Sequence, residues 1–570
     1  MASLEDLGKV VSTDVLIVGG GIGGLPAAIK VKETSPELDV LLVDKATIGW
    51  SGAAPKGGGV FWVIAPEDDL DTFVEVHVKG IGLYLEDQEL LYEFARDTYG
   101  AVEQLAGWGV NVPKHDGKLA TYHILDTRWS HASADMDMLL SLRARARKLG
   151  AKMLNKIQIV DLIKEGDRVA GAVGFNIVDN SFYIFQAKAV ILASGGCHYK
   201  MERMWFAGGG EGIAAAYRAG AEMRNAEFGN LHIFVLKDTG SEPRVPKAQD
   251  YLINSTGEDI SERYNLRGEP FDVPSLKPLV SMDKEVAEGR GPIYLDMTKV
   301  KPPSGGLGEP GRIDWYRPKF DSWRKRSEKL QKYMPPASEK SELSLRFGGA
   351  LSPVKVDHDM RTNLPGLWAI GDTSYMGSSL AGAIPAPPGG VRGSGLMNAV
   401  LGAMKAGPSV ARSTAEVVPP KVSYDMIKQL KEEIFAPMQR KNGIMSDDTL
   451  HALQDIVNPL RYSVRRSKDR LEEAITKLEK IQQELPRLIA KDGHGLFKCH
   501  EVKSLTICAE MTFRAALART ESRGWHYRED YPERDDKNWL KWITLKQDGG
   551  RMVLSTEPIP IERYKVKPSL

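Results

Sequence analysis

The sequence is poor in cysteine. Only three cysteines, Cys197, Cys499 and Cys508, are spread over 570 residues, and no two of them form a C-x-x-C pair. An iron–sulfur cluster normally takes four thiolate ligands. The chain alone therefore cannot hold such a cluster, and we predict no bound metal. If it passes single electrons, another protein must receive them.

Long apolar runs and an excess of one charge are also missing. No run approaches the roughly 18 apolar residues that a membrane span needs, so we expect no direct insertion into a membrane. The first residues lack the basic and apolar regions of a secretory signal. We therefore expect a cytoplasmic protein, with membrane association through a partner as the alternative. A net charge of +1 gives no reason to expect nucleic-acid binding.

Glycine, in contrast, is concentrated near the start of the chain. Four apolar residues, 15–18, run directly into Gly19, Gly21 and Gly24, which stand in G-x-G-x-x-G register before a predicted helix. This pattern predicts a strand, a turn and a helix whose N-terminus faces a pyrophosphate. Gly19 allows the tight turn, Gly21 lets the backbone approach the phosphates, and Gly24 lets helix and strand pack closely.

A second predicted strand, 40–44, ends in an acidic residue. Asp44 stands 20 residues after Gly24, which is the spacing expected of a carboxylate that binds ribose hydroxyls. The glycine triplet between strand and helix and the acid at this distance together predict a dinucleotide-binding α/β domain. The glycine-rich loop 48–59, directly after the second strand, is expected to lie along the same cofactor.

The rest of the chain consists of segments that differ in composition. Predicted strands at 189–196 and 366–372 each run into glycine, whereas 225–345 is richer in proline, lysine, glutamate and tryptophan and predicts an inserted domain. Long charged runs with heptad-like apolar spacing at 422–490 predict a helical bundle. A charged and aromatic segment, 521–536, follows the bundle.

Four signatures in order carry a resemblance to a known family: the glycine triplet with Asp44, Ala193-Ser-Gly-Gly196, Ala369-Ile-Gly-Asp372, and Glu521-Ser-Arg-Gly524 with the charged residues up to Asp536. The chain resembles the flavoprotein subunits of the succinate dehydrogenase and fumarate reductase superfamily. That group includes L-aspartate oxidase and the adenylylsulfate reductase flavoprotein subunit, to which the loop Ser51-Gly-Ala is most similar. The resemblance covers nearly the whole chain.

The resemblance implies a fold class and a cofactor. The expected fold is α/β, with a Rossmann-like FAD-binding domain, an inserted α+β capping domain and a C-terminal helical bundle. The predicted boundaries are 1–224 and 349–412 for the two parts of the FAD-binding domain, 225–348 for the cap, 413–530 for the helical domain and 531–570 for a C-terminal tail. The residues implied to bind FAD are Gly19, Gly21, Gly24, Asp44, Lys45, Ser51, Gly52, Lys56, Gly57, Gly58, Gly195, Asp372, Ser394, Gly395 and Leu396.

Departures from the family pattern concern the flavin link and the substrate. No histidine stands between 44 and 76 to serve as the attachment point, so we expect noncovalent FAD. His232 matches the family histidine that binds a substrate carboxylate, and Arg392 matches the arginine that clamps a second one. Lys277 stands where the family has an arginine proton donor, and Ser344 replaces a second family histidine. Fumarate itself is therefore not the expected substrate.

Three functions stay open at this point. In the first, Lys277, Arg392 and His232 serve hydride transfer between flavin N5 and an activated carbon–carbon bond of a small organic acid or thioester, and an iron–sulfur or ferredoxin-like protein exchanges the electrons. The second is a flavoprotein like that of adenylylsulfate reductase, with sulfur chemistry. The third is an electron-relay flavoprotein without a substrate of its own, which the loss of a histidine at Ser344 suggests.

Overall fold

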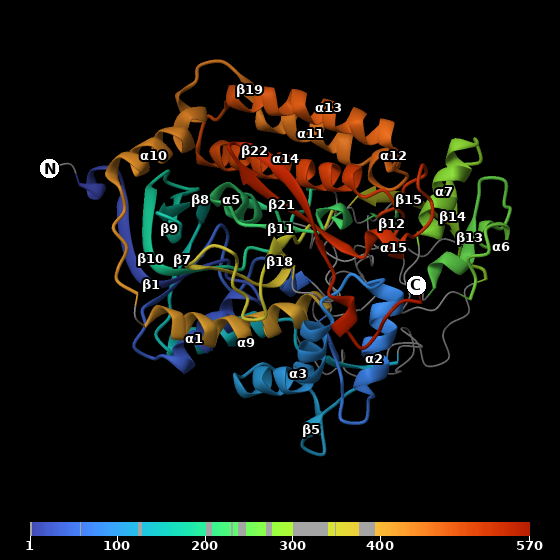
Figure 1. Cartoon of the computed structure of the whole chain (residues 1–570), viewed down its shortest axis with the longest axis horizontal. Coiled ribbons are helices and arrows are strands. Elements are labelled where there is room, and N and C mark those ends of the chain that lie inside the picture. Colours follow the sequence, from blue (N-terminus) through green and yellow to red (C-terminus); the bar gives the residue numbers. More distant parts are fainter. Residues whose placement is uncertain are drawn as a thin grey trace.

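The computed structural model describes residues 3–56, 59–123, 128–200, 208–229, 232–237, 247–268, 276–299, 340–347, 349–375, 394–415 and 417–569 (Figure 1). Most strands of a central sheet come from the first half of the chain. Its strands lie in the order β7 (Lys152–Asn155), β2 (Val40–Asp44), β1 (Lys9–Val18), β10 (Phe182–Leu192), β9 (Arg168–Asn176) and β8 (Ile157–Glu165), with β17 (Leu367–Ala369) also paired to β10.

The middle of this sheet is parallel and buried on both faces. β1 pairs in parallel with β2 on one side and with β10 on the other, so that Val15 lies opposite both Val40 and Ala189. The predicted apolar run of β1 is buried, as expected of a parallel strand covered by helices. Because the strands are parallel, the glycine turn after β1, the end of β2 and the end of β10 meet at one edge of the sheet.

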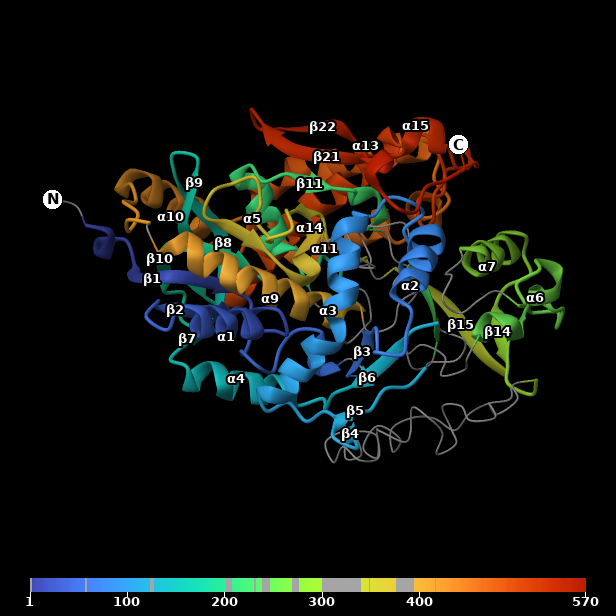
Figure 2. The same cartoon turned by 60° about the horizontal axis from the view of Figure 1, so that its bottom comes forward.

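Helices cover both faces of the sheet. α1 (Gly24–Thr34) packs against α9 (Ser394–Thr414) and α4 (Met138–Lys148), and Figure 2 shows α1 and α9 side by side. α5 (Glu211–Ala219) packs against β8 and against α14 (Gly493–Ala518). The segment after β2 forms β3 (Val60–Val63), α2 (Leu70–Val76), α3 (Gln88–Gly107) and β6 (Ser130–Ser133), with β3 and β6 paired and β3 in contact with α9.

The inserted segment forms a separate antiparallel sheet. Its strands are β12 (His232–Leu236), β15 (Lys340–Phe347), β14 (Ile293–Asp296) and β13 (Leu252–Ile253), in that order, with α6 (Ile260–Arg263) and α7 (Lys277–Ala287) packed beside them. The sheet and its helices enclose an apolar core of their own, which includes Leu252, Met282 and Leu295. We call this unit the cap, after the capping domain predicted for 225–348, and its capping role stays a prediction.

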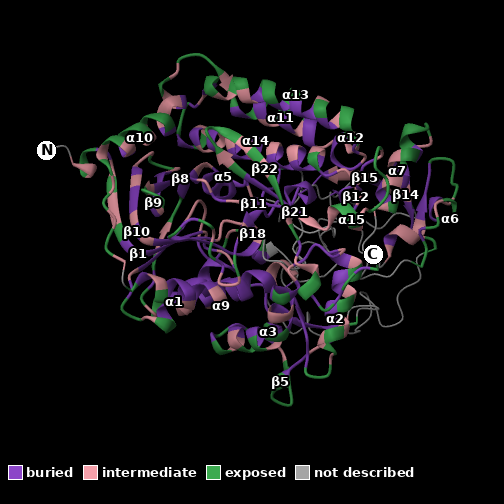
Figure 3. Ribbon diagram, viewed as in Figure 1, coloured by how far each residue is buried: buried purple, intermediate pink, exposed green. Residues whose placement is uncertain are grey.

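The predicted helical bundle is confirmed. It consists of α10 (Tyr424–Gln439), α11 (Ser446–Val457), α12 (Leu460–Ser463), α13 (Lys468–Glu484) and α14. α13 buries one apolar stripe that includes Leu471 and Leu478, whereas α14 is buried along most of its length (Figure 3). α14 therefore lies between the other bundle helices and the FAD-binding domain, in contact with α5, α11 and α13.

The last forty residues are folded and pair with an earlier strand. After α15 (Asp536–Trp539), the strands β21 (Lys541–Asp548) and β22 (Arg551–Pro558) form a hairpin, and β21 pairs with β11 (Met223–Arg224). The segment that was expected as a tail thus closes a sheet with residues just before the cap. Among the described residues, no helix is long and apolar enough to cross a membrane.

Candidate functional site

The three glycines of the turn after β1 have different surroundings. Gly19 has a φ of +111°, and a Cβ there would lie 2.2 Å from the carbonyl oxygen of Ala193. A Cβ on Gly24 would lie 1.9 Å from the carbonyl oxygen of Gly19. Among the described residues no atom lies within 4 Å of the corresponding position at Gly21. Packing within the protein therefore requires Gly19 and Gly24, whereas Gly21 borders open space, as a residue that approaches a pyrophosphate should.

Asp44 lies at the end of β2 against this turn. Its carboxylate accepts hydrogen bonds from the backbone N–H of Gly20 at 2.8 Å and of Ala46 at 2.6 Å, and from the Ser51 hydroxyl at 3.2 Å. These contacts hold the carboxylate at the edge of the sheet where the glycine turn begins. Gly52 follows at φ +87°, and no atom of the described residues lies within 4 Å of a Cβ placed there. Gly57, Gly58 and the side chain of Lys56 lie outside the described part of the chain.

The ends of β10 and β17 bring a second pair of predicted residues together. Gly195 has a φ of +80°, and its carbonyl accepts a hydrogen bond from the Thr373 hydroxyl at 3.2 Å. A Cβ on Gly196 would lie 3.5 Å from the Cβ of Asp372. Two signatures that are about 180 residues apart in the sequence are thus adjacent at the same edge of the sheet as Gly19.

Asp372 carries a buried oxygen without a partner. Its Oδ1 makes no hydrogen bond to any residue that the structure describes, and burial raises the pKa of Asp372 to about 6. A buried carboxylate is costly unless a donor meets it. A Cβ on Gly395, in the first turn of α9, would lie 3.8 Å from this oxygen. Asp372 and the start of α9 at Ser394, Gly395 and Leu396 therefore flank one space, and the hydroxyls of a ribityl chain are the donors that it lacks.

Lys45, directly after Asp44, forms ion pairs with residues of two helices. Its ammonium lies 2.5 Å from Glu211 Oε1 and 3.5 Å from Glu501 Oε1, between α5 and α14. The side chain therefore links the end of β2 to two helices. A contact between Lys45 and the cofactor stays a prediction.

The observations around the glycine turn fit FAD. The open position at Gly21 provides room for phosphates, Asp44 stands beside it for a ribose, and the partnerless oxygen of Asp372 offers an acceptor to the ribityl chain. The N-terminus of α9 can stabilise negative charge on the flavin ring. The roles of these residues in binding FAD stay predictions.

His232 lies at the junction of the cap and the helical bundle. It is the first residue of β12 and only 2% exposed, and its ring packs on Phe347 at 4.8 Å between centroids. Its Nε2 lies 3.1 Å from the carbonyl oxygen of Asn458 and 3.3 Å from the Ser463 hydroxyl. Because a backbone carbonyl only accepts, Nε2 carries the proton. The ring orientation is thus fixed by Asn458, directly after α11, and by Ser463 of α12.

The structure does not bring the other predicted substrate-binding residues together in one described site. Lys277 is the first residue of α7, and its side chain is exposed. Ser344 lies in β15 opposite Val235, with a hydroxyl that has no hydrogen-bond partner among the residues that the structure describes. Arg392 lies outside the described residues. Catalytic roles for Lys277, Arg392 and His232 therefore stay predictions.

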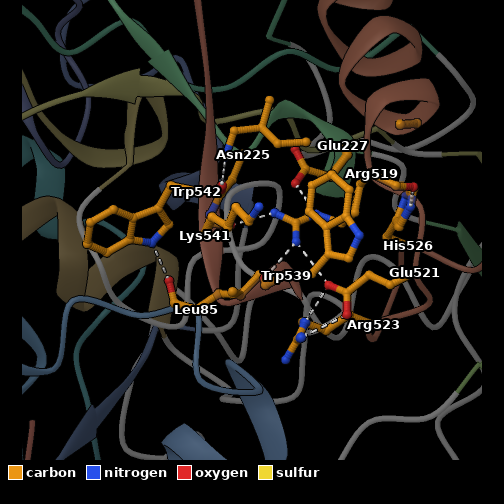
Figure 4. Close-up of polar contacts among 12 residues, drawn as sticks. Leu85, Asn225, Glu227, Arg519, Glu521, Arg523, His526, Trp539, Lys541 and Trp542 are labelled. Atoms are coloured by element: carbon orange, nitrogen blue, oxygen red, sulfur yellow. Dashed lines mark hydrogen bonds and ion pairs between the residues drawn. The ribbon is translucent and has the colours of Figure 1, made fainter. Parts of the chain in front are cut away.

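Sequence reasoning missed a buried ion network behind this junction (Figure 4). Arg519 donates to Glu227 Oε1 at 2.7 Å and to Glu521 Oε1 at 2.9 Å, and Arg523 donates to both oxygens of Glu521 at 2.8 Å. All four side chains are completely buried. The 521–536 signature supplied Glu521 and Arg523, but nothing in the sequence linked them to Glu227 almost 300 residues earlier.

The network joins the C-terminal signature to the rest of the protein. Arg523 Nη1 donates to the carbonyl of Leu83 at 2.6 Å, and Trp542 Nε1 donates to the carbonyl of Leu85 at 2.8 Å. Arg519 Nη2 donates to the carbonyl of Lys541 at 2.9 Å. The signature therefore anchors the segment between α2 and α3 against the last hairpin, and its role in this structure is architectural.

The α/β sheet with a dinucleotide edge, the cap sheet and the helical bundle define a FAD-dependent oxidoreductase. Residues 14–302 match the family model of a FAD binding domain, and residues 451–570 match that of the fumarate reductase flavoprotein C-terminus. The chain belongs to the FAD-binding flavoprotein family of succinate dehydrogenase and fumarate reductase.

Relatives of this family match along almost the whole chain. One of the subunits of the fumarate reductase (CoM/CoB) of Methanothermobacter marburgensis is 26% identical, over 94% of this chain and 97% of that protein. The fumarate reductase flavoprotein subunit of Haemophilus influenzae is 23% identical, over 97% and 95%. These relatives are named as subunits, and at this identity they do not define the substrate of the present chain.

Solved structures share the fold. The quinol fumarate reductase of E. coli superimposes with a TM-score of 0.80 at 20% identity, covering 99% of both chains. The adenylylsulfate reductase of Archaeoglobus fulgidus superimposes with a TM-score of 0.76 at 22% identity, covering 99% of this chain and 98% of that one. The predicted fold class is thereby confirmed, and the similar scores do not separate the two chemistries.

Proposed function

We propose that the protein is a flavoprotein subunit that binds FAD noncovalently and reduces or oxidises an activated carbon–carbon bond in a small organic acid or thioester. Bound FAD supplies the hydride chemistry, at its N5 atom. An iron–sulfur or ferredoxin-like protein exchanges the electrons. The observation that carries this proposal is the position of His232, on the first cap strand, buried and oriented where cap and helical bundle meet.

The chain's own residues have distinct tasks in this proposal. Arg392 and His232 hold the carboxylate or carbonyl that activates the substrate, because charged donors stabilise the negative charge that develops there. His232 would do so in its cationic form through Nδ1, since its Nε2 already donates to the carbonyl of Asn458. Lys277, at the N-terminus of the cap helix α7, gives or takes the proton. Movement of the cap toward the FAD-binding domain would exclude water from these groups.

The composition of the chain supports an external electron partner. Its three cysteines are all buried, and three are fewer than the four thiolates that a cluster normally takes. The matched relatives are named as subunits of reductases and dehydrogenases. Because electron transfer needs only a transient contact, an interface of under roughly 1,200 Å² would suffice. The test is co-purification at low salt, with a small cysteine-rich brown protein as the expected companion.

We expect the flavin to be released by acid. The sequence has no histidine between 44 and 76 to attach it, and Ser51 and Gly52 occupy that part of the loop. Precipitation of the purified protein with acid should leave the yellow colour in the supernatant. Flavin that stays with the washed pellet would show a covalent link and contradict the proposal.

His232→Ala and Arg392→Ala are each expected to lower turnover about a hundredfold with FAD still bound. Loss of one charged or polar anchor costs about 2–4 kcal/mol in the transition state, by analogy with removal of an oxyanion-stabilising donor. Turnover and the flavin content of each variant are measured together. His451→Ala, an exposed histidine on α11, is the matched control and should leave turnover unchanged. Unchanged kinetics in both variants would favour the relay function.

The proposed reaction is distinguished from its two alternatives by a reoxidation experiment. The protein is reduced anaerobically and mixed separately with unsaturated organic acids, with their thioesters, and with adenylylsulfate, and the visible flavin absorbance is followed. Return of the absorbance with an unsaturated acid or thioester supports the proposal. Return with adenylylsulfate alone would identify a sulfur-reducing flavoprotein, and return only with a ferredoxin-like protein would identify a relay without its own substrate.

A further inference from the structure

A small cavity lies where the three parts of the protein meet. Its wall includes Tyr199 from the segment after β10, Phe347 from the cap strand β15, and Ser463, Arg466 and Thr512 from the helical bundle. The volume is about 10 Å³, which is close to the minimum for one water-sized occupant. Most of the remaining wall is apolar. The cavity is adjacent to His232, because Phe347 and Ser463 also contact that ring.

Arg466 is the charged group in this wall, and it is completely buried. Its Nη1 donates to the carbonyl of Glu227 at 2.9 Å and lies 2.8 Å from His526 Nδ1. Within the described part of the chain, its Nε and Nη2 have no hydrogen-bond partner. These two nitrogens form one edge of the planar guanidinium, the edge that binds an acceptor with two parallel N–H groups. Two strong donors of a buried cation are therefore left unused.

No carboxylate neutralises Arg466 by direct contact among the described residues. The Glu227 carboxylate pairs with Arg519, and the neighbouring Arg528 pairs with Asp530 at 2.7 Å. His526 does not supply a negative charge. Its Nε2 lies 3.0 Å from the carbonyl of Arg519, and burial together with Arg466 holds its pKa well below the usual range. Burial likewise lowers the pKa of Arg466 to about 9.

Two hydroxyls in the cavity wall already donate their protons to backbone carbonyls. The Ser463 hydroxyl donates to the carbonyl of Pro459 at 2.9 Å, and the Thr512 hydroxyl donates to that of Cys508 at 3.2 Å. A carboxylate or phosphate needs several times the available volume, whereas a chloride ion, which is only somewhat larger than a water molecule, needs a small outward shift of the wall. An acceptor for both free N–H groups must therefore be a single atom, and a buried, uncompensated cation favours one that carries negative charge.

We propose that the free Nε–Nη2 edge of Arg466 binds a monatomic anion, chloride, in this cavity. The anion accepts both N–H groups and supplies the charge that the guanidinium lacks. It would fix the bundle residues 463 and 466 against the cap strand at Phe347, and so stabilise the junction that orients His232. This inference is independent of the proposed substrate, because it concerns the stability and ion content of the FAD-loaded protein.

The first test uses the unmodified FAD-loaded protein. Its thermal midpoint is compared in potassium chloride, potassium bromide and potassium gluconate at one ionic strength, since gluconate is too large for the cavity. Above the dissociation constant, each tenfold rise in chloride or bromide should raise the midpoint by about 1 °C. Crystals grown with bromide should show an anomalous peak beside Arg466 Nε and Nη2. Equal midpoints in all salts, with a water in the cavity, would overturn the proposal.

Arg466→Met separates a specific site from a general salt effect. The dependence on chloride should disappear in this variant and persist in Arg461→Met, which removes an exposed arginine paired with Glu473 on the same side of the bundle. Arg466→Met that keeps the full chloride effect would refute the site. If Arg466→Met does not fold, the bromide peak in the unmodified protein still decides between an anion and a water.

Discussion

Replacing Gly21 with valine is expected to give a folded protein that retains essentially no FAD. The added Cβ meets no protein atom within 4 Å among the described residues, so the turn itself tolerates the side chain. The same space is where the backbone must approach the pyrophosphate. A branched side chain there would hold the phosphates away from the N-terminus of α1 and remove their N–H contacts. The ratio of visible flavin absorbance to protein absorbance measures the loss.

Two further glycines make this prediction specific. Gly24→Val places its Cβ 1.9 Å from the carbonyl oxygen of Gly19, so this variant is expected to fail in folding rather than in binding. Gly100→Val, in open space on the exposed side of α3, is the matched control and should purify with normal FAD. Circular dichroism separates the folding defect from the binding defect. A Gly21→Val protein that purifies fully loaded would show that the glycine motif has been misassigned.

The parts of the fold that follow local rules could be predicted from the sequence. The run before Gly19 is buried in β1, the pair Gly166-Asp167, a typical turn sequence, joins β8 to β9, and α9 begins at Ser394. Each of these depends on neighbouring residues: an apolar run, a turn pair, and a glycine-rich segment that ends in a helix. The same reasoning found the edge of the sheet that fits FAD, because parallel strands bring their ends together.

The parts that depend on long-range contacts could not be predicted. The hairpin of β21 and β22 was expected as a tail, because its pairing partner, β11, is two residues long and lies more than 300 residues earlier. Arg466 gives no sequence signal, since it stands in a run of charged residues that is typical of an exposed helix start. Its burial follows from contacts with Glu227 and His526, which only the folded chain brings together.

Arg519→Met is expected to cause a large loss of stability. Arg519 is completely buried and lies between Glu227 and Glu521, with its guanidinium also 5.1 Å from the Trp539 ring. A buried ion pair adds little over well-packed apolar groups, but removal of one partner leaves the other charge uncompensated. Here two carboxylates lose a partner at once. The free energy of unfolding should fall by about 3–5 kcal/mol, measured by urea denaturation of the FAD-loaded protein.

Arg534→Met is the matched control for this loss. Arg534 belongs to the same C-terminal segment and pairs with Asp536 at 2.9 Å, but its side chain is 40% exposed. Its removal should change the stability by no more than about 0.5 kcal/mol. Adding Glu227→Gln to Arg519→Met should recover part of the loss, because it removes one of the stranded charges. If both arginine variants unfold at the same urea concentration as the parent, the buried network does not hold the C-terminal hairpin to the segment between α2 and α3.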